Sequence, residues 1–195
     1  MTDPFANLPR NHFGAIYADP PWKFETYSDA GQDRSPDYST MSSAAIEALQ
    51  VGDLAAPDCV LFIWIVWPML EHALRVVDAW GFTYKTCAFS WIKADGKQIN
   101  LFADEIPVQI GTGYWTRANS EVCLLTTRGS PKRRHSDVRQ AIVEPRRQHS
   151  RKPDCVYERI ERLVAGPYLE LFARTTRPGW TAWGNQTDKF KASAA

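Results

Sequence analysis

The sequence predicts a single α/β domain with a mostly parallel, twisted sheet flanked by helices. Short β-prone apolar runs alternate with stretches whose apolar residues recur every three or four positions, the strand–helix alternation of α/β proteins. The run at 59–67 is apolar at nearly every position, as in a parallel strand buried on both faces. With 195 residues, 44% hydrophobic and 23% charged, the chain suffices for one domain with its own core.

The expected elements are strands at 13–18, 59–67, 82–93, 121–127, 168–174 and 180–183, with helices at about 42–50, 68–80 and 153–165. Pro68 and Pro153 suit the first turn of a helix, and Gly81 suits the residue just after one. A flexible lead-in at 1–12 precedes a domain spanning 13–187, and 188–195 is expected to fray. A polar loop at 23–40 and a mixed loop at 94–119 are expected to be long active-site or substrate loops, and the polar loop is long enough to act as a lid.

The first expected strand stops at Asp19-Pro20-Pro21-Trp22. Two successive prolines fix φ twice and remove two backbone donors, so this corner is stiff. In α/β sheets ligands bind outside the carboxyl ends of the strands. An acidic acceptor, free carbonyls and a flat ring at that place suit a planar amine such as adenine. The alternative is an ordinary turn with a capping aspartate and a packed tryptophan.

Segment 128–152 is strongly basic, although the net charge of the whole chain is only +1. It holds nine lysine and arginine residues against two acids, and almost no apolar ones. Such a run inside a domain indicates contact with phosphates, with Arg133, Arg134, Arg146 and Arg147 as candidate nucleic-acid ligands. The alternative is a solvated charged face.

The four cysteines lie far apart without a CxxC spacing, so they predict free thiols of a cytoplasmic protein and neither a metal site nor a disulfide framework. The histidines are isolated as well. No signal peptide is present, and the longest apolar run, 60–70, is too short to cross a membrane. Phosphate-binding glycine loops and common hydrolase motifs are missing too. The reaction therefore depends on positioning more than on acid–base machinery.

Nine short motifs, in this order, resemble the MT-A70 family of adenine-N6 methyltransferases over residues 13–187. They are Ala18-Asp19-Pro20-Pro21-Trp22, Tyr38-Ser39-Thr40-Met41-Ser42, Leu61-Phe62-Ile63-Trp64, Ala79-Trp80-Gly81-Phe82, Trp91-Ile92-Lys93, Gly113-Tyr114-Trp115-Thr116-Arg117, Ser150-Arg151-Lys152-Pro153-Asp154, Glu170-Leu171-Phe172-Ala173-Arg174 and Trp180 through Gln186. The resemblance implies a Rossmann-like, S-adenosylmethionine-dependent fold, with the catalytic strand before the cofactor strand. The family includes messenger-RNA adenosine methyltransferases and compact bacterial and phage DNA methyltransferases.

The resemblance also assigns expected roles at the catalytic corner. Asp19 and the Pro20 carbonyl accept hydrogen bonds from the adenine amine, while Pro21 keeps the corner rigid and Trp22 stacks on the base. Tyr38 is similar to a gate residue near the substrate. Glu121 is similar to a residue beside the target nucleoside, and its alternative is a strand-end acid facing solvent.

For the cofactor, S-adenosylmethionine, the resemblance places Lys152 on the methionine carboxylate, beside Asp19. Arg174, Asn185 and Gln186 match residues that hold the ribose and adenine. Each could instead be a cap or turn residue. Two positions after Arg174 some members have a histidine, where this chain has Thr176.

The leading functional hypothesis is methylation of the N6 amine of adenine in DNA, on a base that is flipped out or unpaired. RNA is the alternative substrate. A different class of hypothesis is a non-catalytic, nucleic-acid-binding subunit, against which the intact corner argues. The sequence leaves open a homodimer or a separate specificity subunit.

Overall fold

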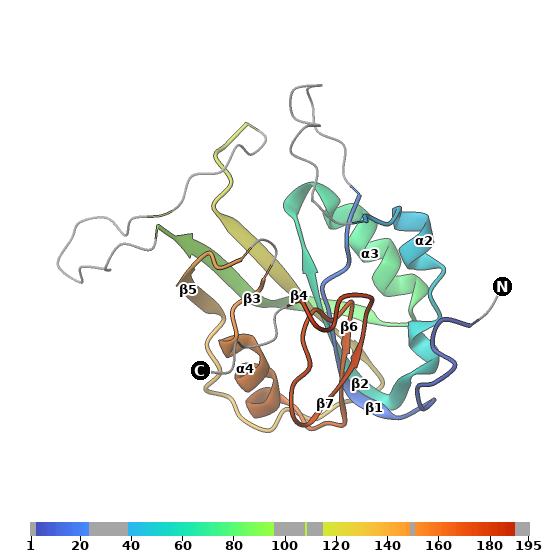
Figure 1. Ribbon diagram of the computed structural model, residues 1–195. Helices are drawn as coiled ribbons and strands as arrows, with labels where there is room; N and C mark the ends of the chain where they lie inside the picture. The colour runs from blue at the N-terminus through green and yellow to red at the C-terminus, as the bar shows by residue number, and fades with distance from the viewer. Residues whose placement is uncertain (1–2, 24–38, 96–107, 109–114, 149–150, 190–195) are drawn as a thin grey trace.

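Seven strands form one sheet in the order β5-β3-β4-β2-β1-β6-β7 (Figure 1). The computed structural model describes residues 3–23, 39–95, 108, 115–148 and 151–189. The elements are β1 (Phe13–Ala18), α2 (Ser43–Glu47), η1 (Val51–Asp53), β2 (Ala55–Ile65), η2 (Trp67–Met69), α3 (Leu70–Ala79), β3 (Thr83–Ala94), β4 (Ser120–Arg128), β5 (Ala141–Pro145), α4 (Cys155–Leu163), β6 (Tyr168–Leu171) and β7 (Trp180–Trp183). Tyr38 and the two long loops, apart from their ends and Val108, lie outside the described residues.

The sheet is mostly parallel, as predicted, and β4 is its reversed strand. β4 pairs antiparallel with β2 and β3, while the other four neighbouring pairs are parallel. We call the edge where β1, β2, β3, β5, β6 and β7 end the carboxyl edge, and the opposite edge the amino edge. Because β4 is reversed, its first residues lie at the carboxyl edge: Val122 pairs with Ile65, whereas Arg128 pairs with Cys59.

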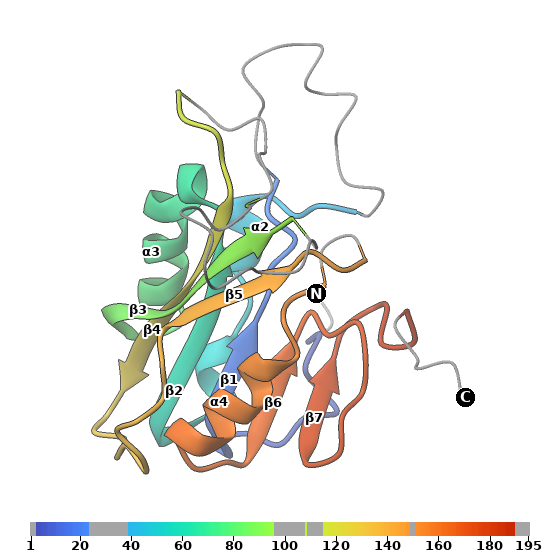
Figure 2. The same ribbon diagram turned by 90° about the vertical axis from the view of Figure 1, so that its left-hand side faces the viewer.

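Helices cover both faces of the sheet, with α2 and α3 on one face and α4 on the other (Figures 1 and 2). The strands alternate their side chains between the two layers, so that Ile16 and Ala18 join the core under α3 while Ala15 and Tyr17 join the core under α4. The α3 side of β1 and β2 is apolar, whereas the α4 side carries polar aromatic rings near the carboxyl edge. The pocket and the charged side chains described below lie on this α4 face.

Several boundaries differ from the sequence prediction for physical reasons. β5 was not predicted, because Ile142 is its one buried residue and basic residues surround it; pairing with β3 makes it a strand. β6 ends at Leu171, before Arg174, because Phe172 takes a left-handed φ of 60° that turns the chain. α4 begins at Cys155, just after Pro153.

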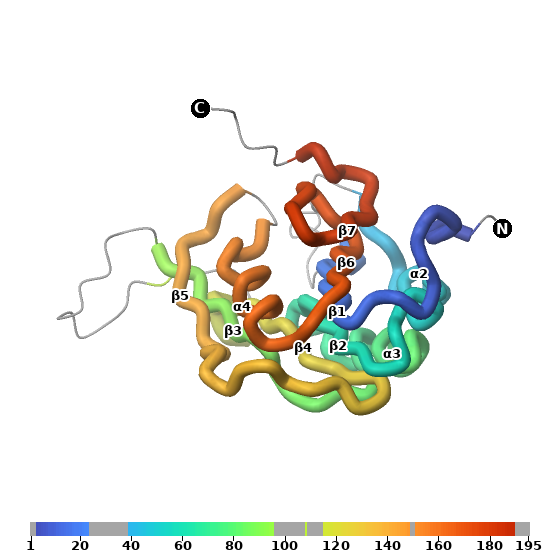
Figure 3. The backbone as a smooth tube through the Cα atoms, turned by 90° about the horizontal axis from the view of Figure 1, so that it is seen from below, coloured from blue at the N-terminus to red at the C-terminus, as the bar shows by residue number. Residues whose placement is uncertain are grey.

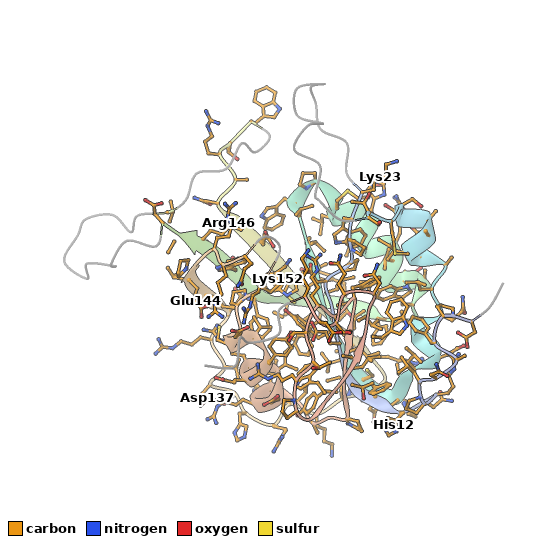
Figure 4. The ribbon with its side chains drawn as sticks, in the orientation of Figure 1. His12, Lys23, Asp137, Glu144, Arg146 and Lys152 are labelled. Carbon is orange, nitrogen blue, oxygen red and sulfur yellow. The ribbon has the colours of Figure 1, made fainter. Side chains whose placement is uncertain are left out.

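The basic segment 128–152 does not form one surface. Residues 129–140 run along the amino edge beneath α4, which Figure 3 shows from below. The Arg159 guanidinium donates to the carbonyls of Arg139 (2.7 Å) and Ala141 (2.8 Å), which fixes this part. β5 then runs parallel to β3 from the amino edge to the carboxyl edge, so Arg146 and Arg147, which follow it, lie at the carboxyl edge. In Figure 4, Asp137 accordingly lies near the level of His12, which precedes β1, and Arg146 lies far from both.

Among the described residues, no helix has the length and apolar character needed to cross a membrane.

Candidate active site

The Asp19 corner is held at the carboxyl edge by a second chain segment. β1 ends at Ala18, and the Trp22 N–H donates to the Pro20 carbonyl at 2.8 Å, which closes the turn. Met41 N–H donates to the Pro21 carbonyl (2.8 Å), and the Lys23 N–H donates to the Met41 carbonyl (3.0 Å). The corner is therefore clamped from outside as well as stiffened by its prolines.

Trp22 is not placed as expected for stacking on a base. Its side chain packs in the core under α3 and the residue is 6% exposed. The indole Nε1–H donates to the Trp64 carbonyl at 2.9 Å. The apolar ring and its single donor are both satisfied inside the protein, which explains why the structure buries it. In this structure Trp22 anchors the corner and offers no open face to a base.

Four charged side chains form a row along the carboxyl edge, which we call the charge row: Lys93, Glu121, Lys152 and Asp19. Lys152 Nζ donates to both oxygens of Asp19 at 2.8 Å and lies 3.3 Å from Glu121 Oε2. Lys93 Nζ lies 2.5 Å from Glu121 Oε1. The row joins residues from β3, β4, the segment before α4 and the end of β1, with signs that alternate.

The alternation fixes the ionisation of its middle members. Burial alone would raise the pKa of Glu121, but the charges of Lys152 and Lys93 outweigh it and lower that pKa to about 2. Burial alone would lower the pKa of Lys152, but the carboxylates of Asp19 and Glu121 raise it above its usual value. Both groups are therefore charged at neutral pH.

Aromatic rings form the floor beneath the two lysines. Lys152 Nζ lies 5.5 Å from the centre of the Trp64 ring, and the Trp64 Nε1–H donates to Tyr17 Oη at 2.7 Å. Lys93 Nζ lies 5.4 Å from the centre of the Trp91 ring. The negative faces of these rings favour the cations above them. Each lysine thus has a fixed apolar support as well as an acidic partner.

A pocket opens beside Asp19 on the α4 side of the sheet. The residues lining it come from the ends of β1 and β6 and the start of α4: Tyr17, Asp19, Arg151, Lys152, Asp154, Tyr157, Glu170, Phe172, Arg174 and Thr175. Three of the predicted site residues, Asp19, Lys152 and Arg174, therefore meet here. Asp19 and Lys152 are 133 positions apart in sequence.

Glu170 belongs to this pocket although the sequence analysis did not single it out. It pairs with Tyr17 across the β1–β6 ladder, is 8% exposed, and accepts a hydrogen bond from Tyr157 Oη at 2.9 Å. Burial is the largest influence on its pKa, which is raised to about 7. The sequence signal that could have identified Glu170 is an acidic residue within an otherwise apolar strand. Burial of a carboxyl group is energetically unfavourable, so such residues are common at functional sites.

The other predicted cofactor residues lie on the turn after β7. The Ala173 N–H donates to the Trp183 carbonyl at 2.9 Å, so the turns after β6 and β7 touch. Gly184 makes this approach possible, since a Cβ there would lie 2.7 Å from Ala173 N. Asn185 and Gln186 follow directly, next to the Arg174 turn but outside the lining of the pocket.

The four candidate arginines are divided between the two edges. Arg146 and Arg147 are exposed at the carboxyl edge, and Arg147 also pairs with Asp154. Arg134 lies at the amino edge, where its N–H donates to the Leu163 carbonyl at 2.8 Å, and Arg133 is its exposed neighbour. The structure thus brings Arg146 and Arg147 to the side of Asp19 and leaves Arg133 and Arg134 on the far side.

Comparison with known proteins places the chain in a family. The MT-A70 family profile matches residues 13–186. The type II methyltransferase M.MunI of Mycoplasma sp is 30% identical over 94% of this chain and 82% of its own length. The N(6)-adenosine-methyltransferase catalytic subunit METTL3 of Homo sapiens is 28% identical over 90% of this chain, and a putative N(6)-adenosine-methyltransferase MT-A70-like protein of Medicago truncatula is 32% identical over 89%. The chain spans 28% and 26% of the lengths of these two eukaryotic relatives. The Asp19 corner lies at the carboxyl edge of a mostly parallel sheet, and the match over nearly the whole chain shows that this protein belongs to the MT-A70 family of methyltransferases.

Proposed function

We propose that this protein transfers a methyl group from S-adenosylmethionine to the exocyclic N6 amine of adenine in DNA. The observation that carries the proposal is the Asp19 corner, clamped at the carboxyl edge beside a pocket whose lining includes Lys152, Glu170 and Arg174. Adenine is proposed from relatives named N(6)-adenosine-methyltransferases. DNA is placed first because the chain covers 82% of a compact type II methyltransferase but about a quarter of those longer relatives.

The pocket suits the proposed cofactor in the chemistry of its lining. Lys152 offers a cation to the methionine carboxylate, and Asp19 offers an acceptor to the methionine ammonium. A vicinal diol such as ribose presents two donors, which suit the carboxyl group of Glu170, and Arg174 adds a donor at the same rim. S-adenosylmethionine, when bound, supplies an electrophilic methyl group on a positively charged sulfur.

The residues of the corner would orient the amine. An aromatic amine is a weak nucleophile because its lone pair is delocalised into the ring. The Asp19 carboxylate and the Pro20 carbonyl would each accept one N–H of the amine, which fixes the direction of the nitrogen lone pair. The bound cofactor would supply the methyl group to the oriented nitrogen, and the Asp19 carboxylate would take up the N–H proton that the methylated amine then releases. Glu121, two strands from Asp19 in the sheet, would border the target nucleoside.

The test is methyl transfer from labelled S-adenosylmethionine to DNA and RNA oligonucleotides of matched sequence, single- and double-stranded. Label is expected in adenine of DNA, most readily where the base is unpaired or mismatched. Label in RNA alone would exclude the DNA substrate and favour the second candidate, an RNA adenosine methyltransferase, which the 28% to 32% identity to the adenosine methyltransferases supports.

A non-catalytic role is separated by a binding measurement. Thermal melting with S-adenosylmethionine at millimolar concentration is expected to show stabilisation of the fold, since a ligand that binds only the native state raises the melting temperature. An unchanged melting temperature would contradict the proposal that the protein is an S-adenosylmethionine-dependent enzyme.

A further inference from the structure

Lys93 is the one member of the charge row that neither lines the pocket nor has an assigned role. Its backbone is fixed in the sheet, because the Lys93 N–H donates to the Asn119 carbonyl at 2.9 Å. Trp91 pairs directly with Glu121 in the β3–β4 ladder, and Lys93 lies two positions further along β3 on the same face. A long side chain reaches such a diagonal neighbour, and here Lys93 Nζ crosses the Trp91 ring to meet Glu121.

We propose that Lys93 is a positioning residue for methyl transfer, acting through Glu121 to hold Lys152 at its place beside Asp19. This inference rests on the function proposed above. Lys93 would touch neither the base nor the cofactor. Its role is to pair with Glu121 Oε1, so that the Glu121 carboxylate is shared between two cations. The attraction of Glu121 for the Lys152 ammonium group is then weaker than it would be if Lys152 were its only partner.

The distances describe the balance that Lys93 maintains. Lys152 Nζ lies 2.8 Å from both Asp19 oxygens but 3.3 Å from Glu121 Oε2. Without Lys93, the whole charge of Glu121 would act on Lys152 and draw Nζ away from Asp19. Water would replace the missing Lys93 ammonium group poorly as a partner of Glu121, because the site is largely buried. The exposed fractions of the side chains are 23% for Lys93, 18% for Glu121 and 11% for Lys152. At such depth a carboxylate that loses one cation binds the remaining one more strongly.

The scaffold around Lys93 is rigid enough for this role. The Trp91 Nε1–H donates to the Glu144 carbonyl of β5 at 2.9 Å, so the ring beneath Lys93 is tied to two strands. Functional groups held by strands keep their geometry better than groups on loops. Lys93 therefore differs from an exposed lysine, whose ion pair contributes little to stability.

The test compares Lys93→Met with Lys93→Arg, and uses Lys85→Met as the matched control, since Lys85 is an exposed lysine on the same strand. For Lys93→Met we expect kcat for adenine methylation at saturating cofactor to fall about tenfold or more, and the dissociation constant of S-adenosylmethionine to rise as well, because the displaced Lys152 also pairs with the methionine carboxylate. Lys93→Arg should recover kcat to within about threefold of the wild type. Lys85→Met should leave both quantities unchanged. Lys93→Gln replaces Lys93→Met if the latter does not fold.

The pH profile gives a readout that a merely structural lysine would not move. The groups facing Glu121 are Lys93 from β3 and Lys152 from the segment before α4, with Asp19 beyond Lys152. Removing Lys93 leaves one cation, so the Glu121 carboxyl group should become protonated at a higher pH in Lys93→Met. Because a neutral Glu121 no longer draws Lys152 away from Asp19, part of the lost kcat should return as the pH is lowered. Unchanged kcat in Lys93→Met or an equal loss in Lys93→Arg would overturn the proposal.

Failure of the proposed function is recognised separately. If the wild type methylates adenine and Asp19→Ala does not, the function stands and Lys93 is judged by its own variants. If the wild type methylates no oligonucleotide, the function fails. Lys93 is then judged by a crystal structure of Lys93→Met, in which Lys152 Nζ should have moved from Asp19 towards Glu121; an unmoved Nζ would overturn the positioning role.

Discussion

Asp19 combines an acceptor for the proposed substrate with a structural ion pair, and the two roles can be separated by mutation. Its carboxylate receives two hydrogen bonds from Lys152 at 2.8 Å, at the end of a corner clamped by Met41. In Asp19→Ala the clamp and the prolines remain, and Lys152 keeps Glu121 as a partner. The corner should therefore keep its backbone while it loses its acceptor.

We expect Asp19→Ala to lower kcat by at least about 100-fold, the usual cost of removing one preorganised polar group from an active site. The melting temperature should change little more than for other ion-pair losses, and the circular dichroism spectrum should be unchanged. Rates are measured with labelled cofactor and an unpaired adenine substrate. Near-wild-type activity would mean that the acceptor for the amine lies elsewhere.

Glu170 should make stability depend on pH in a direction unusual for an acid. Burial raises its pKa from 4.5 to about 7, so between these values the folded protein binds a proton that the unfolded chain does not. Stability is therefore highest below about pH 4.5 as far as this group is concerned, and falls as the pH rises through 7. Glu170→Gln keeps the acceptor for Tyr157 and removes the charge.

At pH 8 the Glu170→Gln variant should thus be more stable than the wild type, by about 1–3 kcal/mol at most, with no difference at pH 4.5. Denaturant unfolding at both pH values measures this. In the same variant, S-adenosylmethionine should bind several-fold more weakly at pH 8, because a neutral amide accepts less strongly from the ribose than a carboxylate does. Equal stability of the two proteins at pH 8 would contradict the pKa assignment.

The residues of the site differ in how visible they were in the sequence. Asp19 stands out through its stiff corner, and Lys152, Glu121 and Arg174 follow from motif order. Lys93 and Glu170 were not singled out, because their roles depend on neighbours that only the sheet brings together: Lys93 meets Glu121 through the β3–β4 ladder, and Glu170 meets Tyr17 through β1–β6. Trp22 was assigned to stacking because a sequence does not show which side of the strand a corner residue packs against.

At the level of elements, strand alternation and reversal build the site. Tyr17, Asp19 and Trp64 share the α4 face of neighbouring strands, and reversed β4 delivers Glu121 to the same edge. The strand at 59–67 could be predicted because it is apolar throughout, and the strand at 82–93 because it is long and rich in aromatic and β-branched residues. β5 could not, since one buried isoleucine within a basic run gives no periodic signal, and its strand form depends on pairing with β3.

The contact between the turns after β6 and β7 gives a prediction for Gly184. A Cβ at this position would lie 2.7 Å from the Ala173 nitrogen, so Gly184→Ala must push the two turns apart. We expect a loss of about 1–3 kcal/mol in stability from the overpacking, together with weaker binding of S-adenosylmethionine, because Arg174 and Asn185 flank this contact. Calorimetric titration measures the binding.

Gly179→Ala is the matched control for Gly184→Ala. Gly179 has a φ of 80° with open space around its position, so alanine there strains the backbone by about 1 kcal/mol without pushing on a neighbour. It should lower the melting temperature and leave cofactor affinity as in the wild type. Equal effects of both substitutions on affinity would show that the turn contact does not shape the pocket.

On the scale of the whole molecule, charge is organised by edges of the sheet. The net charge of +1 gives no general attraction for a polyanion. The sequence shows a basic run at 128–152, but only the fold shows that α4 binds residues 129–140 along the amino edge while Arg146 reaches the carboxyl edge. A run that is continuous in sequence thus serves two different sides, and only one of them lies near Asp19.

This division predicts unequal effects of two exposed arginines on nucleic-acid binding. Arg146 follows β5 at the carboxyl edge, on the side of the Asp19 corner, whereas Arg133 is the neighbour of Arg134 at the amino edge. If the backbone of the substrate is bound near the target base, Arg146→Gln should weaken binding several-fold at about 0.1 M salt and reduce the slope of log K against log salt by about 1, the value for one lost phosphate contact. Arg133→Gln should leave affinity and slope as in the wild type, although it removes the same charge. Fluorescence anisotropy with a labelled oligonucleotide over a series of salt concentrations measures both variants.

Equal slopes for the two variants would mean that attraction depends on total charge, and a larger loss for Arg133→Gln would place the nucleic acid along the amino edge. The expected order follows from geometry alone, because a strand that delivers a base to the carboxyl edge can place its adjoining phosphates on that edge but not on the far side of the sheet.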